Sequence, residues 1–197
     1  MVLPITIVAI LLVAVLLLYL LIGPLDKTEP KIVVMKEPVK MIGVSMRTGM
    51  KTIYQDAAKL GKLYRKVKEQ NIIRDKKEPW GFVAISKDFH GIESWDYLMG
   101  DVVNTLDSIP QGLQAFEIPA MTCAVFPIRP KSKFSWGITI GRMKKYIFTE
   151  WLPGTGYESD STIVGDFEYH DARSTGKKPE IDLYVPIKKR QPTTKIT

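Results

Sequence analysis

The sequence contains few of the side chains that bind metal ions. Its 197 residues include one cysteine, Cys123, and two histidines, His90 and His170. Structural zinc sites take four cysteine or histidine ligands, so no such set can be assembled from this chain. A mixed site of His170, Asp171 and Glu168 is conceivable, but acids and histidines at a strand end are usually exposed polar residues. We expect neither a metal ion nor a cofactor.

Motifs of common catalytic sites are also missing. The chain has no G-x-S-x-G turn, no G-x-G-x-x-G or phosphate-binding loop and no EF-hand loop. We therefore assign no catalytic residue and expect a binding protein rather than an enzyme.

Charge is absent from the first 25 residues. This apolar run exceeds the ~20 residues that cross a ~30 Å hydrocarbon core, so we predict a transmembrane helix over residues 1–25. A cleaved secretory signal is the alternative, but it needs a basic start, an apolar stretch of about 7–15 residues and a small-residue cleavage site, none of which occurs. Basic residues such as Lys27, Lys31 and Lys36 follow the helix and none precedes it. This asymmetry predicts a single-pass membrane protein with its soluble domain in the cytoplasm.

The rest of the chain carries the whole formal charge of +7. Its basic residues gather in three clusters: Lys59, Lys62, Arg65, Lys66 and Lys68; Arg74, Lys76 and Lys77; and Lys188, Lys189 and Arg190. Such clusters could attract an anionic membrane surface, or they could simply form solvated surfaces. We expect no nucleic acid as a partner, since no DNA-binding or RNA-binding motif accompanies the charge.

Hydrophobic periodicity predicts the order of elements. The expected elements are a strand region broken by Pro38 (31–49), a helix (52–70), a hairpin (80–103), a strand pair or long bent strand (113–130), a second helix (136–152) and two final strands (166–171 and 180–188). The order is strand, helix, strand, strand, written twice. We therefore predict an α+β fold of duplicated β-α-β-β units, with a mainly antiparallel sheet and a central cleft between the halves, preceded by the transmembrane helix. The expected boundaries are a linker at 26–31, a domain at 32–190 and a short polar tail at 191–197.

Aromatic residues stand beside acids in the predicted strands. Aromatic faces with a carboxylate among them suit a lipophilic cation, through ring quadrupoles and charge. The alternative for each aromatic residue is a place in the core, and for each acid a place in solvent. The residues proposed to contact a ligand are Asp182, Tyr184, Glu168, Trp95, Tyr97, Trp136 and Trp151.

The last predicted strand alternates between two kinds of side chain. Glu180, Asp182 and Tyr184 share one face, while the aliphatic residues between them share the other and are expected to pack on the core. Among the acids of this strand, Asp182 is the preferred ligand-facing carboxylate.

Five segments together resemble the GyrI-like small-molecule-binding domain, which is also the effector-binding domain of AraC-type and MerR-type activators. They read WDYLMGDVV, IPQGLQAFEIPAMTCAVFPIRP, YIFTEWLPGTGYESD, DFEYHD and IDLYVPIKK. The resemblance covers about residues 32–189 and implies a duplicated β-α-β-β fold whose cleft binds hydrophobic, often cationic, molecules. It also implies an acid four residues before a proline of the last strand, the place that Asp182 takes before Pro186.

The resemblance leaves three functions open. The first is a membrane-anchored protein that binds an amphipathic or cationic small molecule. The second is a scaffold that binds a protein, as gyrase-inhibiting relatives do, and the third is hydrolysis of reactive cyclopropane-type electrophiles. A filled cleft would favour the scaffold, and a carboxylate with a raised pKa in a dry cleft would favour hydrolysis.

Overall fold

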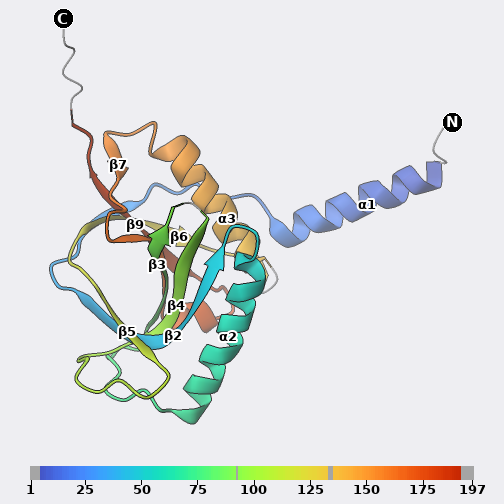
Figure 1. The fold of residues 1–197 in the computed structure, drawn as a ribbon. Helices are drawn as coiled ribbons and strands as arrows, with labels where there is room; N and C mark the ends of the chain where they lie inside the picture. The colour runs from blue at the N-terminus through green and yellow to red at the C-terminus, as the bar shows by residue number, and fades with distance from the viewer. Residues whose placement is uncertain (1–4, 92, 133–134, 192–197) are drawn as a thin grey trace, which may run out of the picture.

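The computed structural model describes residues 5–91, 93–132 and 135–191 (Figure 1). The elements are α1 (Ile5–Ile22), β1 (Lys31–Val34), β2 (Val39–Gly49), α2 (Ile53–Gln70), β3 (Phe82–His90), β4 (Ser94–Val102), β5 (Gln114–Ile118), β6 (Thr122–Ile128), α3 (Trp136–Tyr146), the π-helical turn η1 (Ile147–Trp151), β7 (Tyr157–Ser159), β8 (Val164–His170), the 3₁₀ turn η2 (Ala172–Thr175) and β9 (Ile181–Lys189). The predicted tail falls almost entirely in 192–197, outside the described residues.

Helix α1 projects away from the rest of the chain (Figure 1). It ends where Gly23 adopts a left-handed φ of 69° and Pro24 follows, so its 18 residues extend roughly 27 Å. Within the described residues, no helix is long and apolar enough to cross a membrane. The predicted transmembrane helix over 1–25 is thus not found as a membrane span, and residues 1–4 of that prediction lie outside the described part.

The segment after α1, predicted as a polar linker, is bound to the second half of the domain. Arg142 donates to the carbonyl of Gly23 at 2.9 Å, Arg129 pairs with Asp26 at 2.7 Å, and Lys27 pairs with Glu150 at 2.6 Å. Leu25 adds an apolar contact to the core beneath α3. The connection between α1 and the domain is therefore held by contacts at several points.

In the described residues, nine antiparallel strands form one sheet, in the order β1-β6-β9-β8-β3-β4-β2-β5, with β7 paired to β9. The first unit is β2-α2-β3-β4 and the second is β6-α3-β8-β9, so the predicted α+β duplication is present. The two units join where β3 pairs with β8, with Ala84 opposite Glu168 and Ile85 opposite Phe167. That junction lies in the middle of the sheet, and α2 and α3 cover the same face on either side of it.

Three predicted segments differ in detail. The region broken by Pro38 is two separate strands, β1 on β6 and β2 on β4 and β5, because the proline separates segments with different partners. Strands β5 and β6, predicted within 113–130, do not pair with each other, since β5 adds to β2 and β6 to β1 and β9. The helix predicted over 136–152 is α3 followed by η1, whose wider turn carries Trp151 inward.

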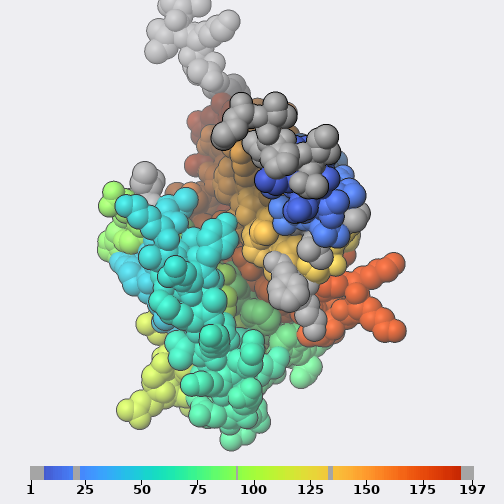
Figure 2. Space-filling view, turned by 90° about the vertical axis from the view of Figure 1, so that its right-hand side faces the viewer, coloured from blue at the N-terminus to red at the C-terminus, as the bar shows by residue number. Residues whose placement is uncertain are grey.

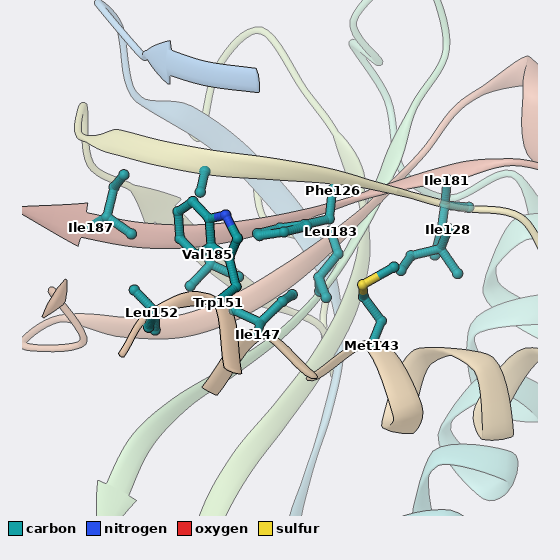
Figure 3. Close-up of a cluster of buried hydrophobic side chains, with 11 residues drawn as sticks. Phe126, Ile128, Met143, Ile147, Trp151, Leu152, Ile181, Leu183, Val185 and Ile187 are labelled. Atoms are coloured by element: carbon teal, nitrogen blue, oxygen red, sulfur yellow. The ribbon is translucent and has the colours of Figure 1, made fainter. Parts of the chain in front are cut away.

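The core beneath α3 contains the apolar face of β9, as its alternation predicted. Ile181 and Leu183 are fully buried there beside Phe126 and Met143 (Figure 3). Trp151 packs edge-on against Phe126, with ring centroids 5.1 Å apart. A second buried cluster lies on the opposite face of the sheet and includes Phe167, so both faces of the central strands are covered.

Candidate functional site

A pocket of about 620 Å³ lies between α2 and α3, over the central strands β8, β3 and β4. Figure 2 looks onto the side of the molecule on which both α2 (teal) and α3 (yellow to orange) lie. Helix α3 presents Gly137 and Gly141, one turn apart, to the Tyr54 side chain of α2. A Cβ at Gly141 would lie 3.2 Å from the Tyr54 hydroxyl. The glycines thus leave room for the aromatic ring at the edge of the pocket.

The walls are mainly apolar and aromatic. Trp95, Tyr97 and Met99 project from β4 at alternate positions, and Ile53 and Ala57 face them from α2. Alternation along a strand places side chains two apart on one face, which is why one strand supplies three neighbouring wall residues. A cavity of this size and lining falls in the range of small-molecule sites, about 300–1,000 Å³.

Two carboxylates lie in this wall, and both come from β8. Asp166 and Glu168 are two residues apart and so share the pocket face of the strand. Glu168 is 8% exposed. The hydroxyl of Tyr97 remains protonated, because burial raises its pKa well above the ordinary value and the nearby charges of Glu168 and Asp166 raise it further.

A lysine from α3 completes the charged part of the pocket. Lys144 Nζ lies 2.5 Å from Asp166 Oδ2 and 3.7 Å from Glu168 Oε1. On its other side Glu168 lies 3.5 Å from His170 Nε2. Burial raises the pKa of Glu168, but the His170 imidazole and the Lys144 charge outweigh it and hold that pKa below its ordinary value. Glu168 is therefore an ionised carboxylate at neutral pH.

A family model described as Cass2, integron-associated effector binding protein, matches residues 33–187. The chain belongs to this family. A comparison with curated proteins found no match.

Solved structures share the fold of this Cass2-family chain. One is SAV2435 bound to tetraphenylphosphonium, with a TM-score of 0.64 and 12% identity over 82% of this chain and 94% of that one. Another is the integron cassette protein from Vibrio cholerae, with a TM-score of 0.59 and 11% identity over 84% and 100%. A third is a bacterial transcription regulation protein from Staphylococcus aureus, with a TM-score of 0.59 and 12% identity over 82% and 99%.

Three of the seven residues proposed from the sequence line the pocket of the Cass2 domain: Trp95, Tyr97 and Glu168. Trp136 is not in the lining, but its ring lies 6.1 Å from that of His170, next to the charged end. Trp151 lies in the core beneath α3 (Figure 3). Its Nε1 donates to Glu29 Oε2 at 3.4 Å.

Asp182 and Tyr184 lie on the other face of the sheet. In the pairing of β8 with β9, Tyr169 is opposite Asp182 and Phe167 is opposite Tyr184. Directly paired residues share a face, so both lie with Phe167 and Tyr169, away from Glu168. Asp182 there pairs with Arg173 at 2.5 Å, and the Tyr184 ring stacks on Phe167 at 4.8 Å. Asp182 is thus part of a surface ion-pair network outside the pocket.

Sequence reasoning missed Lys144 and Asp166. A signal existed for both: Asp166 is two residues before Glu168 and shares its face, and Lys144 is four residues after Ile140, on the buried side of the predicted helix. A charge at a buried position of an amphipathic helix indicates a partner across the interface.

Proposed function

We propose that the Cass2 domain of this chain binds a lipophilic cation in the pocket between α2 and α3. The observation that carries the proposal is the pair of carboxylates, Asp166 and Glu168, which lie with Lys144 in a mainly apolar and aromatic pocket. Aromatic faces attract a cation through their quadrupoles, and the attraction grows when water is excluded. SAV2435, a protein of the same fold, has been solved with tetraphenylphosphonium bound, which supports this ligand class.

The alternatives fit the pocket less well. Hydrolysis of a strained electrophile would be favoured by a carboxylic acid with a raised pKa, whereas the pKa of Glu168 is lowered. Protein binding by a filled cleft would have Trp95, Tyr97 and Trp151 packed on one another, whereas Trp151 lies in a separate core. An open pocket with an ionised Glu168 favours reversible capture of a cation.

The test is titration of the full chain with tetraphenylphosphonium, followed by thermal unfolding and by tryptophan fluorescence, since Trp95 lines the site. A ligand at 100 times its Kd raises the free energy of unfolding by about 2.7 kcal/mol, or roughly 5–10 °C for a domain of this size.

Glu168→Gln should weaken binding, while Glu158→Gln should not. Glu158 is the matched control because it lies on β7 at the surface, paired with Lys188 at 3.5 Å. The proposal is refuted if the cation shifts neither the unfolding midpoint nor the fluorescence, or if Glu168→Gln leaves the affinity unchanged.

We also propose that α1 associates the chain with a membrane and that the domain faces the cytoplasm. The support is the uncharged run of residues 1–25, the basic residues that follow it and the exposure of apolar side chains such as Ile10 and Leu12, which are 68% and 65% exposed. Such side chains gain about 0.8 kcal/mol per buried CH₂ on entering lipid.

Flotation with vesicles of neutral phosphatidylcholine should recover the full chain at the top of the gradient. Recovery at the bottom refutes membrane association, and cleavage of the domain by protease added to intact cells refutes the orientation.

A further inference from the structure

The pocket contains a cation of its own. Lys144 from α3 reaches the two carboxylates of β8, at 2.5 Å from Asp166 and 3.7 Å from Glu168. A cationic ligand drawn to these carboxylates therefore meets a position that an ammonium group already occupies. The Lys144 ammonium group therefore competes with a cationic ligand for the two carboxylates.

The neighbouring carboxylates keep the Lys144 ammonium group charged. Burial lowers the pKa of Lys144, but Asp166 and Glu168 outweigh it, so its pKa lies above the ordinary lysine value. Among the residues that the structure describes, the charged side chains of the lining are Lys144, Asp166 and Glu168, which together carry one net negative charge when all are ionised. A monocation can be accommodated, but only with weaker attraction than two free carboxylates would exert.

The geometry also lets the lysine leave. Its side chain is 31% exposed, and because Lys144 lines the pocket, part of that area opens into the cavity. An ammonium group on a four-carbon chain holds a carboxylate by a point contact and regains rotamer freedom on release. The surrounding helix does not have to move for this exchange, since only the end of the side chain is involved.

We infer that Lys144 is a tethered competitor that sets the cation specificity of the pocket. Binding exchanges the Lys144 ammonium for the ligand cation at Asp166 and Glu168, so the ligand must offset the lost ion pair with apolar contacts. A large cation with aromatic groups does this against Trp95 and Tyr97. A small hydrated cation does not, and the pocket excludes it. This inference rests on the proposed cation-binding function.

The experiment compares the full wild-type chain with Lys144→Met and Lys145→Met. Lys145 is the matched control because it is the next residue of α3 and is exposed, so its replacement changes net charge equally without altering the pocket. The probes are tetraphenylphosphonium, the small cation tetramethylammonium and the neutral triphenylmethanol, with affinities measured by calorimetry or fluorescence.

Lys144→Met should bind tetraphenylphosphonium roughly tenfold tighter or more, since close charge pairs at binding sites couple by at least about 1.5 kcal/mol. It should also gain detectable affinity for tetramethylammonium. Triphenylmethanol should bind all three proteins alike, and Lys145→Met should match the wild type with every probe. A merely structural role of Lys144 would change the affinity for the neutral probe as well.

Equal or weaker cation binding by Lys144→Met, with the wild type still binding, overturns the competitor role and leaves the proposed function standing. If no variant binds any cation, the proposed function fails and the competitor role with it. Circular dichroism confirms folding first, and Lys144→Gln, which keeps a hydrogen-bond donor for Asp166, replaces the methionine variant if that variant does not fold.

Discussion

Tyr64→Phe should destabilise the domain by removing one hydroxyl from a buried polar cluster. Tyr64 of α2 donates to Asp101 Oδ1 at 2.5 Å. Asp101 is 0% exposed, and its other partners are Trp80 Nε1 at 3.3 Å and Lys76 Nζ at 3.2 Å. Burial raises the pKa of Tyr64, and the hydrogen bond to Asp101 and its charge raise it further, so the hydroxyl stays protonated and donates to Asp101.

The magnitude follows from what remains after the substitution. A phenylalanine ring keeps the packing of Tyr64 on Phe82, whose centroid is 5.2 Å away, so the change is confined to the hydrogen bond. Hydrogen bonds to charged groups contribute about 1.5–3 kcal/mol. We expect the free energy of unfolding to fall by about 2 kcal/mol, which lowers the Tm by roughly 4–8 °C.

Thermal and urea unfolding of the full chain measure the effect, with Tyr54→Phe as the matched control. Tyr54 lies on the same helix and is 70% exposed, so losing its hydroxyl should cost less than about 0.5 kcal/mol. Equal Tm values for Tyr64→Phe and Tyr54→Phe would refute the reasoning, because they would show that the Asp101 cluster contributes nothing that α2 needs.

Three further predictions concern the sheet and its cores. Phe126→Ala should lower the free energy of unfolding by about 3–5 kcal/mol, because its fully buried ring packs on Trp151. Phe148→Ala, at a position that is 43% exposed, should lower it far less. Similar denaturation midpoints for the two variants would contradict the predicted cost of losing the buried ring. Gly43→Ala should disrupt the pairing of β2 with β4, since its Cβ would lie 1.9 Å from a backbone oxygen. Gly61→Ala in α2, where a Cβ would have no atom within 4 Å, should instead stabilise the fold by roughly 0.5–1 kcal/mol. Urea unfolding measures both variants, and a Gly43→Ala variant as stable as the wild type would contradict the predicted loss of strand pairing. Burial raises the pKa of the Cys123 thiol to about 12, so alkylation near neutral pH should follow the fraction unfolded; rapid labelling of the native chain would contradict that burial.

Much of the secondary structure could be predicted from local pattern. The period of three and four residues predicted a helix over 52–70, and α2 runs from Ile53 to Gln70. Alternation predicted the hairpin of β3 and β4 and the packing face of β9. These elements could be predicted from the sequence because their apolar faces are continuous over many residues. Strand β7, with three residues, was missed because it is too short to show a period.

The pairing of strands could not be predicted from the sequence in the same way. β5 and β6 follow each other in the chain, yet β5 is the last strand at one end of the sheet, whereas β6 lies near the other end, between β1 and β9. Alternation shows which side chains share a face of one strand, but not which strand lies beside it. The partner depends on contacts between residues far apart in the sequence, and only the folded sheet supplies them.

The candidate site shows the same division. Glu168 and Asp182 both alternate with apolar residues on predicted strands, and their local sequences do not distinguish them. The pairing of Glu168 with Leu183, and of Tyr169 with Asp182, places the two acids on opposite faces. The periodicity of the second helix likewise could not separate Trp151, in the core, from Lys144, in the pocket.

The sequence by itself determined the charge-free first 25 residues, the two β-α-β-β units and the supply of aromatic and acidic side chains, because composition and periodicity are local properties. The tertiary structure decided that β3 meets β8, that α2 and α3 border one pocket there, and that Lys144 enters it to meet Asp166 and Glu168. A site assembled across the junction of two units exists only when strand register and helix packing bring distant residues together.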